Sequence, residues 1–292
     1  GEARARSLEA WRGLSLQRRR TIVDRLAEMT EDNVELDFSS IFMTGLVDDD
    51  VQVRADSVKA LWEYEGSELV AVLIRLLKDP EAIVRAEAAL GLGRFLLRAE
   101  LMEESGRRVE EIEEALREVI RDEDELVEVR GRAIEAVGVR GHDWVHDLIE
   151  DAYASGDRRL QISAVHAMGR NADLEWLPTI TDEMHSDDPE MRFEAATAAG
   201  ALADEEAIPE LATMALDEDA EVQEAAIAAL GQIGGNAARN VLNELASETE
   251  DDRVLEAISD ALAEAEFLDD PMSLKLHLDQ SLADDTDEDE FE

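Results

Sequence analysis

Residues 191–202 read MRFEAATAAGAL, and the same pattern returns 31 residues later as VQEAAIAALGQIGG in residues 222–235. An earlier stretch, residues 84–93, reads VRAEAALGLG in the same register. Each stretch contains an Arg or Gln, here Arg192, Gln223 and Arg85. The apolar residue just before this position and the residues three and seven positions after it have the spacing of one helix face. A glycine stands eight residues after the Arg or Gln, where it can end the helix or allow a neighbouring backbone to approach closely.

The pattern extends through most of the chain. A second apolar set follows each stretch and predicts a partner helix, and Asp in the intervening turns can cap the next helix, with Pro in its first turn at Asp79-Pro80 and Asp188-Pro189. Four of the five intervals between the recurring Arg or Gln positions are 31 residues, and the interval from Arg85 to Arg130 is 45. These positions are Arg54, Arg85, Arg130, Gln161, Arg192 and Gln223.

Six regular hairpins and an imperfect one at each end predict an all-α fold, a right-handed α-α superhelix of about eight helical hairpins. We expect a capping hairpin in residues 1–47, around Ile22 and Leu26, and a repeat array in residues 48–268. The enlarged hairpin at about 79–122 is either a longer hairpin with its own small core or a protruding recognition ridge. Its glutamates would face outward: Glu103, Glu104, Glu110, Glu111, Glu113 and Glu114.

The three quoted stretches resemble the short HEAT-like repeats first described in phycobilisome lyases, over about residues 48–264. The resemblance implies an α-solenoid. It implies little about function, because that family includes scaffolds, lyase subunits, hydroxylases and DNA glycosylases.

Composition narrows the function classes. The chain has 73 acidic and 28 basic residues and a formal net charge of −45, so phosphate backbones are repelled and direct nucleic-acid binding is disfavoured. The absence of cysteine removes disulfides and thiolate chemistry. No apolar run approaches the roughly 20 residues that span a bilayer, so we expect no membrane segment and a cytoplasmic location. The excess of carboxylates with only three lysines resembles salt-in halophiles, although acidic solenoids occur elsewhere.

No constellation of catalytic residues emerges. None of the five histidines is followed by Glu, the dipeptide that serves as ligand in the hydroxylases of the resembled family. His142 and His146 are spaced to share a helix face and imitate a zinc motif, but Asp143 replaces the glutamate base and a third ligand is not evident. The sequence therefore predicts no catalytic, cofactor or metal site.

Candidates for partner contact are few. Trp144 occupies an offset where other hairpins have Glu or Ala, so it is either an exposed anchor or packs against the enlarged hairpin; His146 lies beside it on the predicted helix. Phe193 lies either at a repeat junction or against a partner. Trp176 is expected in the core, and the recurring arginines are expected to bond turn carboxylates rather than to bind anions.

The two ends differ in charge. Six arginines in the first twenty residues suggest either a capping helix or docking to an acidic surface. Residues 269–292 predict an extended segment followed by a disordered acidic tail. Within it, alternating apolar residues suggest either a segment lying on its own solenoid or a docking peptide: Leu274, Leu276 and Leu278.

Together these features predict a non-catalytic protein-protein interaction scaffold whose concave helix layer binds a protein with a basic surface. One alternative is an accessory or lyase-type subunit that acts on a chromophore-bearing or modified protein. Another is regulation of a basic nucleic-acid-binding protein by acidic mimicry.

Overall fold

The computed structural model describes residues 9–33 and 36–269, which are helical with short connections and contain no strand. The chain forms two compact units, Gly1–Ala164 and Val165–Glu292. Unit 1 contains α2 (Leu16–Asp32), α3 (Ser39–Gly45), α4 (Val51–Ala60), α5 (Ser67–Leu76), α6 (Ala82–Leu101), α7 (Arg107–Arg121), α8 (Val127–Val137) and α9 (Asp143–Ala154).

Helix α10 (Arg158–Asn171) carries the boundary between the units. Unit 2 continues with η1 (Leu174–Trp176), α11 (Leu177–Glu183), α12 (Pro189–Leu202), η2 (Glu205–Ala207), α13 (Ile208–Met214), α14 (Ala220–Ile233), α15 (Gly235–Glu248) and α16 (Asp252–Asp269). The predicted all-α solenoid is confirmed.

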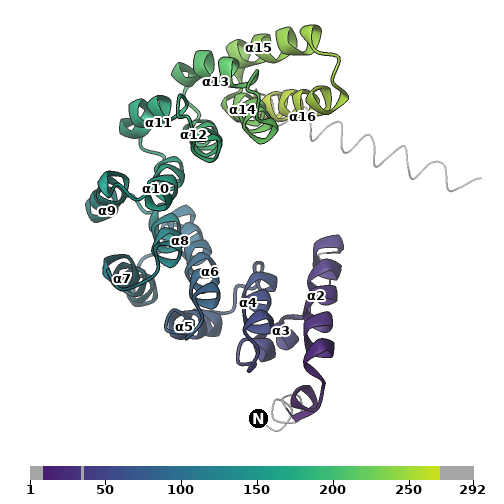
Figure 1. Ribbon diagram of the computed structural model, residues 1–292, viewed down its shortest axis with the longest axis vertical. Helices are drawn as coiled ribbons and strands as arrows, with labels where there is room; N and C mark the ends of the chain where they lie inside the picture. Colours follow the sequence, from purple (N-terminus) through teal and green to yellow (C-terminus); the bar gives the residue numbers. More distant parts are fainter. Residues whose placement is uncertain (1–8, 34–35, 270–292) are drawn as a thin grey trace, which may run out of the picture. The chain divides into compact units, whose positions relative to one another are not determined.

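Each unit has two helix layers (Figure 1). The first helices of successive hairpins pack side by side: α2, α4, α6 and α8 in unit 1, and α12, α14 and α16 in unit 2. We call these the first-helix layers. The second helices of the hairpins form the other layer, and the core lies between, where Leu73 of α5 and Leu92 of α6 are fully buried. Each such leucine contributes on the order of 2 kcal/mol to folding.

The recurring glycines let neighbouring first helices approach closely. A Cβ added to Gly93 would lie 2.9 Å from the Cα of Ala136, and one added to Gly231 would lie 2.8 Å from the Cα of Ala261. These distances are well inside the roughly 3.5–4.0 Å of ordinary carbon contacts. Both glycines lie within their helices and serve close approach, whereas the equivalent Gly138 stands at the C-terminal end of α8.

The recurring arginines join successive turns. Arg192 donates from Nη1 to the carbonyl oxygen of Ser186 at 2.9 Å, and its Nε and Nη2 donate to Asp217 at 2.8 and 2.9 Å. Arg85 bonds the carbonyl of Asp79 and the carboxylate of Glu125 in the same way. The expected bonds to turn carboxylates are confirmed for Arg54, Arg85 and Arg192. Nε of Arg130 donates instead to the carbonyl oxygen of Ile120, at the end of α7.

Aspartates cap most of the first helices, as predicted. Asp50, Asp188 and Asp219 accept hydrogen bonds from backbone N–H groups at the starts of α4, α12 and α14. The prediction for Asp79-Pro80 is wrong: α6 begins at Ala82 after Glu81, so Pro80 lies before the helix. The cap position of α6 holds Glu81, where α4, α12 and α14 have aspartate, and the Glu81 side chain makes no cap hydrogen bond. Asp79 pairs with Arg54 and also accepts a hydrogen bond from the N–H of Glu81 at 3.0 Å.

The enlarged hairpin consists of α6 and α7. Leu96, Ile112 and Leu116 are buried, which supports a hairpin with its own core. The prediction that Glu113 faces outward is wrong. Its side chain is 12% exposed, and its Oε1 accepts a hydrogen bond from Nε of Arg140 at 2.8 Å. Arg140 is buried and lies between α8 and α9, so this bond joins the enlarged hairpin to that connection.

The N-terminal arginines of α2 take part in the solenoid. Nη2 of Arg20 lies 2.6 Å from Asp50, and Nε of Arg19 lies 2.9 Å from Asp48. These pairs connect α2 to the turn before α4, which supports the capping interpretation. The buried contact of α2 is Val23, however, whereas the expected Ile22 is only half-buried.

No helix in the described ranges is both long enough and apolar enough to cross a bilayer.

Candidate protein-interaction site

Phe193 lies on α12 at its junction with α14, and 36% of its surface is exposed. With Thr197 it forms one wall of a groove of about 560 Å³ on the first-helix layer of unit 2. The two alternatives for this residue are therefore compatible, because it lies at a repeat junction and is also accessible. Other repeats carry Ala, Gly, Ile or Glu at the same offset.

Small side chains of α14 form the opposite wall of the groove. Ala225, Ala228 and Ala229 line it, and Gln232 closes it beside Gly200. Methyl groups facing an aromatic ring leave room for an apolar side chain, whose burial contributes about 25 cal/mol for each Å² removed from water. The groove can therefore take an apolar anchor from outside.

Carboxylates give this groove its charge. Glu221 and Glu224 both line it from α14. Glu224 pairs with Arg253 of α16, whereas no cation in the described part of the chain pairs with Glu221. One carboxylate beside the groove thus remains available to a cationic group.

Trp144, the second candidate, lies near the start of α9 and is half-buried. The guanidinium carbon of Arg117, from α7, lies 3.8 Å from the centre of its indole ring. This cation–π contact is made with the enlarged hairpin and supports the packing explanation.

The two histidines near Trp144 have separate surroundings. His142 precedes α9, with Nε2 3.5 Å from Glu113. His146 lies one turn later, with Nδ1 4.0 Å from Glu150. Within residues 9–33 and 36–269, no group of three or more His, Asp or Glu side chains is placed to hold a metal ion.

The remaining candidates divide between the core and the C-terminal segment. Trp176 is 5% exposed and its Nε1 donates to Asn171 at 3.1 Å, so the predicted core position is confirmed. Leu274, Leu276 and Leu278 lie outside the described residues.

The sequence interpretation missed Trp62. It stands where later repeats have the glycine, and in the structure its side chain is 55% exposed. The signal was present as a bulky residue in a column of glycines.

Comparisons with known proteins identify the repeats. The family model for HEAT repeats matches residues 40–101, 145–230 and 177–263. No curated protein matches the chain. Among solved structures, the complex of CpcE and CpcF of phycocyanin lyase from Nostoc is similar at 18% identity over 83% of this chain and 93% of that chain, with a TM-score of 0.60.

Two further structures are similar with lower scores. Human deoxyhypusine hydroxylase in complex with glycerol shares 18% identity over 78% of this chain and 96% of that chain, with a TM-score of 0.36. The Escherichia coli protein YibA shares 16% sequence identity over 81% of this chain and 96% of that chain, with a TM-score of 0.46. Identities this low relate folds and not activities. The matched repeats cover more than half of the sequence, and the chain belongs to the family of HEAT-repeat proteins.

Proposed function

We propose that this protein is a non-catalytic scaffold that holds a protein partner on the first-helix layer of unit 2, at the Phe193 groove. The observation that carries the proposal is the exposed phenylalanine in a groove lined by alanines, with Glu221 and Glu224 beside it. An aromatic anchor site with charged neighbours is a common arrangement at protein interfaces.

The charges define the partner's chemistry. The groove favours a segment in which an apolar side chain is followed or preceded by Lys or Arg, since the apolar group would cover Phe193 and the cation would approach Glu221. The net charge of −45 raises the rate of encounter with basic proteins at low salt and disfavours nucleic acid.

The experiment is affinity capture from native lysate at the salt concentration of the source, followed by mass spectrometry and a binding titration with the captured protein. We expect a basic protein in a fixed ratio to the scaffold. Phe193→Ala should weaken its binding at least tenfold, which corresponds to the loss of about 1.4 kcal/mol or more at an interface anchor.

Phe267→Ala is the matched control, because Phe267 is also an exposed phenylalanine of unit 2, on α16. Equal losses in the two variants, or no loss in Phe193→Ala, would count against the groove. Glu221→Gln should weaken binding and reduce its dependence on salt.

The alternative is an accessory or lyase-type subunit, and the likeness to phycocyanin lyase subunits motivates it. A pigment that co-purifies with the chain and absorbs visible light would favour this alternative over the scaffold.

A further inference from the structure

The hairpin of α4 and α5 lacks the glycine that the later repeats have at the contact between first helices. Where Gly93 and Gly231 touch the next first helix, this hairpin has Trp62. An indole has no room at such a backbone contact, and α4 ends at Ala60, so that residues 61–63 form a turn. The tryptophan therefore turns toward solvent.

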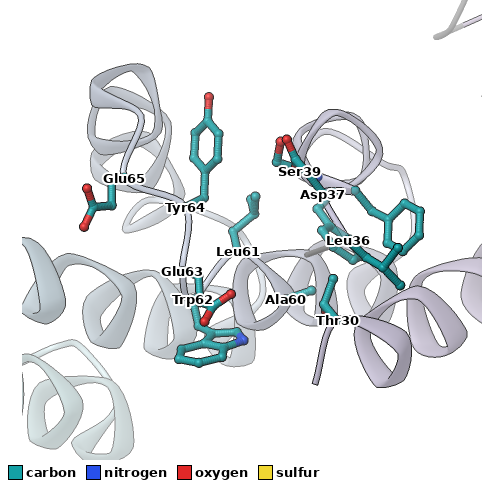
Figure 2. A pocket seen from close by; sticks show the side chains of 12 residues that line it. Thr30, Leu36, Asp37, Ser39, Ala60, Leu61, Trp62, Glu63, Tyr64 and Glu65 are labelled. Carbon is teal, nitrogen blue, oxygen red and sulfur yellow. The ribbon is translucent and has the colours of Figure 1, made fainter. Parts of the chain in front are cut away.

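This turn forms one side of a pocket in unit 1 (Figure 2). The pocket has a volume of about 370 Å³. Trp62 and Glu63 come from the connection between α4 and α5, and Asp37 comes from the segment before α3. Leu61 and Phe42, both 1% exposed, form its apolar base. The volume lies near the lower end of ligand pockets and suits one long side chain.

Arg94 of α6 stabilises this turn through hydrogen bonds to its backbone. Its guanidinium donates to the carbonyl oxygens of Leu61 and, at 3.3 Å, Tyr64. Burial lowers the pKa of Arg94 to about 10, so it stays protonated at neutral pH. Its charge is directed to these carbonyls, and it fixes the turn from which Trp62 projects.

The rim of the pocket is negative. Among the described residues no cation pairs with Asp37 or Glu63, whereas Glu65 lies 2.8 Å from Arg98. Hydrogen bonds from Ser39 hold the pKa of the Asp37 carboxyl below its ordinary value, so this group is charged at neutral pH. Two carboxylates and an exposed indole thus surround an apolar base.

We propose that this pocket binds an arginine side chain of a partner polypeptide. Its aliphatic stem would lie on Leu61, and its guanidinium would stack on Trp62 and pair with Glu63 or Asp37. Arginine suits the site better than lysine because its planar, weakly hydrated group stacks on aromatic rings and forms paired hydrogen bonds with carboxylates. This inference goes beyond the proposed function, since it uses another pocket in another unit.

The test follows the indole N–H signals of the ¹⁵N-labelled full chain, which has four tryptophans. The probes are the acetylated methylamides of arginine, lysine and norleucine, added at one salt concentration. We expect arginine to shift the Trp62 signal in a saturable manner, lysine to bind about threefold more weakly, and uncharged norleucine to leave the signal unchanged.

Variants separate the pocket from general charge effects. Glu63→Gln should weaken arginine binding, whereas Glu128→Gln, an exposed glutamate of α8, should leave it unchanged. Trp62→Gly restores the residue of later repeats and should abolish binding, with the other three indole signals in place as evidence of folding. Phe193→Ala should have no effect, which keeps this test independent of the Phe193 groove. An unmoved Trp62 signal, or equal binding of norleucine or lysine, would overturn the proposal.

Discussion

Arg54 donates two hydrogen bonds to Asp79, from Nε to Oδ2 at 2.9 Å and from Nη2 to Oδ1 at 2.8 Å. Arg54 lies on α4 and Asp79 in the connection that precedes α6, so this pair fixes one hairpin against the next. Arg192 and Asp217 repeat the arrangement in unit 2. Where glutamine replaces the arginine, Gln223 keeps a bond to a preceding carbonyl, that of Ala215 at 2.9 Å. Compared with glutamine, arginine makes the additional bond to the carboxylate of the following turn.

Replacing Arg192 by methionine should lower the free energy of unfolding by about 1–2 kcal/mol, because it removes a partly buried pair of charged hydrogen bonds. Arg192→Gln should cost less, since glutamine can retain the bond to the turn carbonyl. Urea denaturation measures both variants. Arg107→Met is the control: Arg107 pairs with Glu111 on an exposed helix face, and its loss should change stability by less than about 0.5 kcal/mol.

The Arg192–Asp217 pair should also respond to pH. The hydrogen bond from Arg192 holds the pKa of Asp217 below its ordinary value. Its stabilising contribution is therefore fully present above the pKa of an unfolded aspartate, about 4, and is lost as the pH falls through the lower folded value.

The measurement is the difference in melting temperature between the wild type and Asp217→Asn from pH 6 to about pH 3. The difference cancels the relief of general charge repulsion that acid produces in so acidic a chain. We expect it to shrink below about pH 4. A difference that stays constant across this range would show that Asp217 does not act through its charge.

Gly231→Ala should destabilise the protein although alanine favours helices by about 1 kcal/mol. The added methyl group would meet the backbone of α16 at 2.8 Å from both the Cα and the carbonyl oxygen of Ala261. We expect a net loss of about 1–3 kcal/mol in urea denaturation. Gly141→Ala is the matched control, because nothing lies within 4 Å of its added Cβ. If both variants behave alike, the close approach is not what requires glycine.

Trp144→Ala should lower stability by about 1–2 kcal/mol, since it removes the ring on which Arg117 rests and part of the contact with the enlarged hairpin. Trp144→Phe should recover some of this loss. Thermal unfolding gives the stability, and a titration with the captured partner gives the second readout. Weaker partner binding without a change in stability would support Trp144 as an anchor and contradict the packing role.

The repeats were predictable because each hairpin carries the same residues at the same offsets. The residues three positions after the recurring Arg or Gln, from Ser57 to Ala226, are local in sequence, and the structure places each of them within the first helix of its hairpin. Departures from the pattern were harder to predict. The cap position before α6 holds Glu81 where other repeats have aspartate, and the sequence does not state whether this longer side chain caps the helix.

The site was less predictable than the fold. Phe193 was identified from its offset, but its exposure depends on the alanines of α14, which come from the next repeat. Glu113 was assigned to a solvated face because Arg140, its partner, lies 27 residues away. Trp62 was visible as an exception among glycines, yet its surroundings depend on the end of α4 and on the segment before α3.

The glycine contacts separate two kinds of position on the first-helix layer. At Gly200 and Gly231 the backbones touch, and almost no substitution is possible. The offset of Phe193 lies beside these contacts, and it already holds five residue types in this one chain: alanine at two repeats, glycine, isoleucine and glutamate at others, and phenylalanine here. Natural variation can therefore alter what the surface recognises while helix spacing stays constant, so that binding specificity and fold evolve independently.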